Sequence, residues 1–124
     1  MRPNTEYIID ISHSPDRKPR GFIKALIKRP GRPAEMVWLR NTLESFQKVV
    51  GGYIETVTLA SDLIIICNEE GRMLRLPHNC NICNVDFVGT ILLIGSKGDD
   101  FVSLKYSPEQ LLQFFPELFF VEVF

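Results

Sequence analysis

Four side chains have the types and spacing of zinc ligands. His78, Cys80 and Cys83 form the pattern His-x-Cys-x-x-Cys, and Cys67 ends an apolar run shortly before them. Imidazole nitrogen and thiolate sulfur are the usual ligands of structural zinc. The chain has a single Cys-x-x-Cys pair, however, and a cysteine in an apolar run is typical of a buried thiol that packs as a small hydrophobe. We therefore predict no metal and keep a structural zinc site as an alternative.

Residues suited to catalysis are few. The histidines are His13, in a polar connector, and His78, which is near Cys80 but has no recognisable oxyanion hole or orienting group beside it. Glu69 and Glu70 are adjacent in a turn, where neighbouring side chains point apart. The sequence also has no Walker-type phosphate loop, and no Gly-x-Gly-x-x-Gly motif links a strand to a helix. We expect a protein that is not an enzyme and carries no cofactor.

Polar residues beside the expected buried strands are candidates for ligand binding: Asn68, Arg72, Arg75, Asn79 and Thr90. Arginine suits phosphate or carboxylate groups, and a few amides and hydroxyls can orient a ligand in a small pocket. The same residues could instead satisfy turn backbones at the rim of a sheet, and that alternative stays open.

Composition indicates an ordinary globular protein of 124 residues, with 45% hydrophobic and 23% charged residues and a net charge of -1. Residues 1–40 carry nine Lys/Arg against four Asp/Glu, which leaves nucleic-acid binding as a further alternative. Its basic patch would comprise Arg17, Lys18, Arg20, Lys24, Lys28, Arg29 and Arg32.

We expect a cytoplasmic location. The cysteine count is odd, and the sequence has neither an apolar run of membrane length nor a signal-type N-terminus.

The chain up to residue 76 predicts a short strand, a hairpin, a helix and three more strands. Residues 7–11 suit a short strand, and residues 22–28 and 35–39 a hairpin. Asn41 with Glu44 predicts a capping box for a helix that Gly51-Gly52 ends. Residues 53–59 alternate as a half-exposed strand, residues 63–67 read as a central strand, and residues 68–71 predict a tight turn into a partner strand at 72–76.

The second half predicts two more strands, a helix and a terminal strand. Residues 78–86 read as a polar loop, residues 87–95 as an apolar strand interrupted at Gly89, and residues 101–104 as its partner. Ser107, Pro108 and Gln110 have the spacing of a capped helix start, and Pro116 ends that helix. Residues 118–124 read as an apolar strand, which we expect to pair with residues 7–11 or with a second copy of the chain.

These elements predict an α+β fold: a mainly antiparallel sheet with one or two helices packed on one face. The joins are too short for most parallel crossovers. We expect an N-terminal extension at residues 1–20 and a single α+β domain at residues 21–124.

Several motifs in order resemble a known family: Lys24-Ala25-Leu26, Arg29-Pro30-Gly31, Asn41-Thr42-Leu43-Glu44, Val50-Gly51-Gly52-Tyr53-Ile54-Glu55, Cys67-Asn68-Glu69-Glu70-Gly71, Leu76-Pro77, Asn79, Val88-Gly89-Thr90 and Phe101-Val102-Ser103-Leu104. The chain resembles domain of unknown function 3846, short proteins and domains of bacteria, their phages and mobile elements, over about residues 22–115. His78, Cys80 and Cys83 lie outside that pattern. The resemblance implies a phage or mobile-element context and supplies no catalytic residue.

The function we expect is that of a non-catalytic, homo-oligomeric phage-type protein that sequesters a small phosphorylated or nucleotide-like signal and so counters host defence. The main alternative is an inhibitor that binds a host protein through the C-terminal strand.

Overall fold

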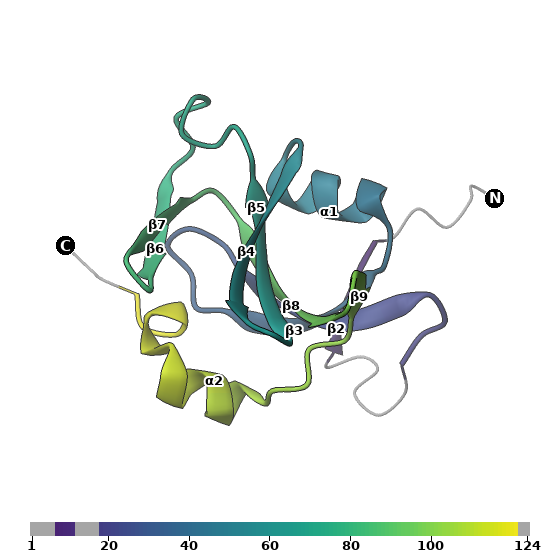
Figure 1. Cartoon of the computed structure of the whole chain (residues 1–124). Helices are drawn as coiled ribbons and strands as arrows, with labels where there is room; N and C mark the ends of the chain where they lie inside the picture. Colours follow the sequence, from purple (N-terminus) through teal and green to yellow (C-terminus); the bar gives the residue numbers. More distant parts are fainter. Residues whose placement is uncertain (1–6, 12–17, 122–124) are drawn as a thin grey trace.

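The computed structural model describes residues 7–11 and 18–121 (Figure 1). Its main sheet has the strand order β1-β3-β2-β8-β5-β4, and β9 pairs with β8 beside this path. All of these pairs are antiparallel. The strands are β1 (Ile8–Asp10), β2 (Phe22–Lys28), β3 (Glu35–Arg40), β4 (Ile54–Ala60), β5 (Leu63–Asn68), β8 (Ile91–Lys97) and β9 (Asp100–Val102).

The remaining elements cover this sheet. A separate two-stranded hairpin is formed by β6 (His78–Ile82) and β7 (Val85–Val88). The helices are α1 (Leu43–Val50), α2 (Pro108–Phe114) and the 3-10 turn η2 (Pro116–Leu118). No helix in the described parts of the chain has the length and apolar character needed to cross a membrane.

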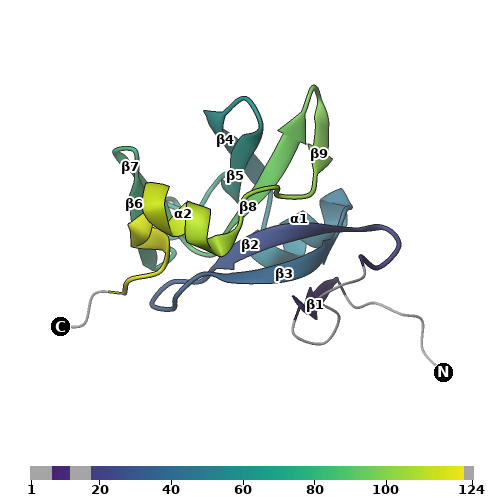
Figure 2. The same ribbon diagram turned by 90° about the horizontal axis from the view of Figure 1, so that it is seen from below.

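Two apolar cores lie on opposite faces of the sheet, because successive residues of a strand point to opposite sides. In β5, Ile65 joins the core that contains β6, β7, α2 and η2, whereas Ile64 and Ile66 join the core beneath α1. All six residues of β5 are buried, which confirms it as an internal strand. The α+β class and mainly antiparallel sheet are confirmed, but the two helices are divided between the faces, as Figures 1 and 2 show.

Helix α1 begins one residue later than the sequence predicted. The N-cap is Thr42, whose hydroxyl accepts a hydrogen bond from the backbone N–H of Ser45 at 3.2 Å. The predicted cap, Asn41, instead donates from its side chain to the carbonyl of Phe101 at 3.0 Å. The predicted end is confirmed, since Gly51 adopts φ 83, a left-handed conformation that costs glycine little.

Helix α2 begins as predicted. The Ser107 hydroxyl accepts from the Gln110 N–H at 3.1 Å, and the Gln110 side chain accepts from the Ser107 N–H at 2.8 Å. Of its apolar residues, Leu111 is buried, whereas Phe114 remains 67% exposed.

The region after β5 differs most from expectation. The predicted partner strand at residues 72–76 is wrong, because residues 69–75 form consecutive turns, with Arg75 at φ 57. The predicted polar loop at residues 78–86 is instead the β6–β7 hairpin. Its turn is made by Cys83 (φ 52) and Asn84 (φ 67), the backbone of a type I′ turn without a glycine. The inward residues of the hairpin, including Cys80, join the core.

The C-terminal segment is not a strand within the residues that can be described. Residues 116–118 form η2, Leu118 is fully buried, and residues 119–121 have no strand pairing. Residues 122–124 of the predicted strand lie outside the described residues. The short N-terminal strand is confirmed as β1, and its partner is β3. β1 thus joins part of the predicted extension to the main sheet.

Candidate functional site

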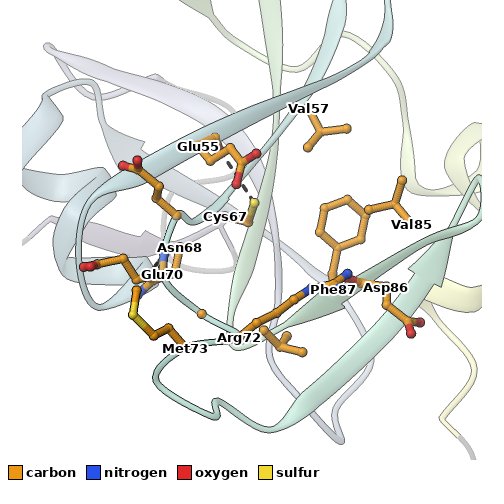
Figure 3. Close-up of a pocket in the computed structure, with 13 residues that line it drawn as sticks. Glu55, Val57, Cys67, Asn68, Glu70, Arg72, Met73, Val85, Asp86 and Phe87 are labelled. Carbon is orange, nitrogen blue, oxygen red and sulfur yellow. Dashed lines mark hydrogen bonds between the residues drawn. The ribbon is translucent and has the colours of Figure 1, made fainter.

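Two hollows lie on either side of the β6–β7 hairpin. The hollow on the β7 side has a volume of about 460 Å³ and is bounded by β4, the end of β5, the turn that follows and β7. We call it the acidic hollow, because its lining includes Glu55, Glu69, Glu70 and Asp86 (Figure 3). The hollow on the β6 side has a volume of about 350 Å³ and is lined by Lys28, Gly31, His78, Asn79, Cys80, Asn81, Glu117, Phe120 and Val121. We call it the lysine hollow.

Two of the predicted ligand residues lie in the acidic hollow, where each serves the fold. Asn68 is buried, its Nδ2 donates to the carbonyl of Val50 at 3.0 Å, and its Oδ1 accepts from the Glu70 N–H at 2.7 Å. It therefore ties the end of α1 to the turn after β5. The Arg72 guanidinium donates to the carbonyl of Asp86 at 3.0 Å (Figure 3).

The charge of the acidic hollow does not suit phosphate. Four carboxylates line it against one guanidinium, that of Arg72. Its thiol, Cys67, donates to the carbonyl of Glu55 at 3.7 Å. Burial, and then the Glu55 carboxylate, raise the pKa of Cys67 to about 11, so the group is a neutral thiol at pH 7. The acidic hollow thus offers neither an anion site nor a nucleophilic thiolate.

The lysine hollow contains a buried cation at the end of β2. Lys28 is only 2% exposed, although strand ends usually leave lysine in water. Its ammonium donates to the carbonyl of Arg29 at 3.1 Å and forms no salt bridge with any carboxylate that the structure describes. Desolvation lowers the pKa of Lys28, and the neighbouring Cys80 thiol partly offsets that effect. An anion bound next to this ammonium would stabilise its charged form.

Asn79 supplies the second unusual group in the lysine hollow. Its Nδ2 donates to the carbonyl of Lys28 at 2.8 Å and to that of Gly89 at 2.7 Å. These two acceptors fix the orientation of the amide. The side-chain oxygen of Asn79 is buried, and it receives no hydrogen bond from the described residues. An unsatisfied buried acceptor costs about 1–3 kcal/mol. This oxygen has almost no accessible surface, so a donor on a ligand reaches it only after a local movement of the side chains around it.

Cys80, the thiol in the lysine hollow, is unreactive for the same reason as Cys67. Burial raises the pKa of Cys80 to about 11; the Lys28 ammonium opposes that shift and the Glu117 carboxylate adds to it. Cys80 is therefore protonated at neutral pH. The structure gives it no role as a nucleophile.

The candidate zinc ligands are separated. Cys67 lines the acidic hollow, His78 and Cys80 line the lysine hollow, and Cys83 is exposed at the hairpin turn. No group of three or more His, Cys, Asp or Glu residues is placed to hold a metal ion in residues 7–11 and 18–121. His78 and Cys80 of the His-x-Cys-x-x-Cys pattern lie on β6, whereas Cys83 lies in the turn that follows it.

Three residues of the basic patch that the sequence suggested are buried or have contacts within the chain. Lys28 is buried, Arg29 pairs with Glu35 at 2.6 Å, and Lys24 lies over the Trp38 ring at 5.5 Å. Arg17 lies outside the described residues.

Of the five predicted ligand residues, the structure therefore places Asn68 and Arg72 in the acidic hollow and Asn79 in the lysine hollow. Arg75 and Thr90 line neither. The sequence analysis assigned Lys28 to the alternative basic patch and not to the ligand site. The two-residue period of a strand puts Lys28 on the same face of β2 as Leu26. That shared face was the available signal, since Leu26 belongs to the core.

The chain matches a protein-family model. A family model described as a domain of unknown function (DUF3846) matches residues 23–118, most of the chain. That range includes Lys28, Asn79 and the whole acidic hollow. Neither a curated protein nor a solved structure matches the chain.

Proposed function

The chain belongs to the DUF3846 family, and since that description names no activity, we propose from the lysine hollow that it is a non-catalytic protein that binds a small phosphorylated or nucleotide-like molecule. The single observation that carries this proposal is that Lys28 and Asn79, both buried and both incompletely satisfied, line the same hollow. A buried ammonium without a carboxylate and a buried amide oxygen without a donor each raise the free energy of the folded protein. An anionic group on a ligand would compensate the ammonium directly, and a hydrogen-bond donor on the same ligand would compensate the amide oxygen after a local movement that opens this atom to the hollow.

The chemistry of a nucleotide fits this pair of groups. Its phosphate would accept a charge-assisted hydrogen bond from the Lys28 ammonium, and an amino or imino group of its base would donate to Asn79 Oδ1. His78 and Asn81 add polar groups to the lining, and Glu117 adds a further acceptor. A volume of about 350 Å³ is within the range of small-molecule sites.

Binding without turnover is supported by the state of the thiols. The pKa values of Cys67 and Cys80 are raised to about 11, so neither provides a thiolate at neutral pH. In the described residues, neither thiol is hydrogen-bonded to a histidine that could activate it.

The biological setting belongs to the same proposal. The resemblance to proteins of phages and mobile elements suggests that capture of a nucleotide signal in the host cytoplasm counters a defence response. We retain homo-oligomerisation in this proposal. Its supporting observation is the exposure of Phe114 (67%) and Phe120 (69%), two large apolar side chains that a second subunit could cover.

The proposal is tested by isothermal titration calorimetry of the full chain with a panel of cyclic and linear nucleotides. Lys28→Met removes the buried charge, and Lys24→Met is its matched control on the same strand face, outside the lysine hollow. We expect a nucleotide to bind to wild type and to the control, and to bind Lys28→Met at least about tenfold more weakly. If no member of the panel binds, or if both variants bind equally well, the proposed function is wrong.

The alternative of a protein inhibitor that uses the C-terminal strand stays a prediction. Residues 116–118 of that segment form η2, and residues 119–121 pair with no strand in the described residues. A different strand has the geometry for protein binding.

A further inference from the structure

We propose that the outer edge of β4 binds an extended, lysine- or arginine-rich segment of a partner protein by strand addition. This inference is independent of the lysine hollow. β4 ends the strand order of the main sheet, and its only strand partner in the described chain is β5 (Figure 2). The other side of β4 is therefore a seven-residue edge.

The register shows which backbone groups this edge presents. The Glu69 N–H donates to the carbonyl of Tyr53 at 2.8 Å, so these opposing residues form a hydrogen-bonded pair. Such pairs alternate along an antiparallel ladder, which directs the backbone groups of Glu55 and Val57 toward β5. The intervening N–H and C=O groups, those of Ile54, Thr56 and Thr58, point away from β5, and no strand in the described part of the chain pairs with them, so an added strand could do so.

The edge has little of the protection that natural sheets give to such strands. Lysine, proline or a very short strand commonly blocks edge pairing. β4 contains neither lysine nor proline, and its only charged residue is Glu55. A register shift near Thr58 disturbs its last residues, which leaves Ile54 to Thr58 as the regular part of the edge. The opposite edge strand, β1, has only three residues and offers much less backbone.

Charge determines the kind of partner. Glu55 is exposed and lies with Val57 in the lining of the acidic hollow, together with Glu69, Glu70 and Asp86 (Figure 3). Alternate side chains of an added strand would project on the same face as Glu55 and Val57. Lysine or arginine at those positions would face this group of carboxylates, so the electrostatic match favours a basic segment.

A second copy of the chain fits the edge less well. Symmetric pairing of β4 with β4 of another copy would be centred on Thr56. It would place the two Glu55 side chains diagonally on one face, about 7–8 Å apart, and bring the two acidic hollows together. Like charges at that separation oppose self-pairing. A basic partner gains from the same carboxylates.

The experiment uses fluorescence anisotropy of two labelled peptides of about eight residues, one alternating Lys and Thr and the other alternating Glu and Thr. We expect the full chain to bind the Lys peptide and not the Glu peptide, with affinity falling as salt rises. Thr56→Pro removes one outward N–H without removing a bond to β5, and it should weaken binding at least about tenfold. Thr56→Val, the matched control, keeps the N–H and should bind as wild type does.

A second variant tests the charge of the edge without proline, which could disturb the local fold. Glu55→Lys leaves the backbone intact, and we expect it to reduce Lys-peptide binding and to raise Glu-peptide binding. The proposal is overturned if the Lys peptide does not bind to wild type, if both peptides bind equally, or if Thr56→Pro binds as wild type does while remaining folded by circular dichroism. It is also overturned if sedimentation shows that wild type self-associates through β4 and that Thr56→Pro abolishes that association.

Discussion

Lys28→Met should stabilise the protein while removing its ligand binding. The lysine side chain is 2% exposed, and methionine matches most of its aliphatic stem, so the substitution leaves little empty space. It removes one hydrogen bond, from the ammonium to the carbonyl of Arg29. It also removes the need to take a cation out of water. The balance between those two terms determines the sign of the change in stability.

The magnitudes favour stabilisation. A hydrogen bond from a charged donor contributes about 1.5–3 kcal/mol, whereas taking an ion fully out of water costs several kcal/mol even after the protein relaxes; Lys28 lines the lysine hollow, so it bears only part of that cost. We therefore expect the free energy of unfolding at pH 7 to rise by about 1 kcal/mol, which corresponds to about 4 °C in Tm for a chain of this size. A buried cation that the fold keeps at such a cost is expected where binding requires it.

The pH dependence gives a second test of the same substitution. Desolvation lowers the pKa of Lys28 in the folded protein below its unfolded value of 10.5. The folded state therefore bears the cost of the buried charge below its lowered pKa, and that cost disappears as pH rises toward 10.5. The stability of wild type relative to Lys28→Met should thus increase over that window. Groups that do not interact with Lys28, Cys67 among them, contribute equally to the two proteins and cancel in the difference. Cys80 does not cancel, because the Lys28 ammonium lowers its pKa, so the difference reports the coupled pair Lys28 and Cys80.

Urea unfolding of wild type, Lys28→Met and the Lys24→Met control at pH 7 and pH 10.5 measures both effects. We expect Lys28→Met to be at least as stable as wild type at pH 7, and the difference in the free energy of unfolding to narrow at pH 10.5. A loss of more than about 2 kcal/mol at pH 7 would show that Lys28 is a structural residue, and the case for a ligand site would lose its main support.

Two further predictions concern other parts of the chain. In native protein at pH 8, a thiol reagent such as DTNB should react with the exposed Cys83 and not with Cys67 or Cys80, because burial raises the pKa values of these two thiols to about 11. Fast reaction of all three thiols would contradict the burial of Cys67 and Cys80. Hydrogen bonding from Lys105 lowers the pKa of Asp62 in the folded protein. The stability that this carboxylate adds is therefore present above its unfolded pKa of 3.8 and is lost as pH falls through the folded value, so Asp62→Asn should reduce the fall in the free energy of unfolding at acid pH. An unchanged fall at acid pH in the variant would refute that assignment.

The elements that could be predicted from sequence are those with local determinants. The capping box of α2 depends on Ser107 and Gln110 alone, and it forms as expected. The continuous apolar run that became β5 also gives a local signal, since a strand buried on both faces needs no alternation. The start of α1 shows the limit of such reasoning. Asn41 and Thr42 are both good caps, and the hydrogen bond from Asn41 to Phe101, 60 residues away, decides between them.

The candidate site depended on contacts that no local pattern contains. The burial of Lys28 requires residues of β6 and the segment that begins at η2, both far from it in the chain. The β6–β7 hairpin itself was missed because its turn residues, Cys83 and Asn84, adopt positive φ without a glycine. The strand β6 also gives no alternating signal, because its burial does not alternate and its register shifts between His78 and Cys80. Asn79 was identified as a polar residue, but its unsatisfied oxygen is a property of the packed structure.

The most direct test of the lysine hollow is mass spectrometry of the small molecules released when wild type and Lys28→Met are purified in parallel and denatured. The account predicts a phosphorylated or nucleotide-like compound in near-stoichiometric amount from wild type and little or none from the variant. Equal release from both proteins, or no such compound from wild type even after incubation with a nucleotide pool, would contradict it.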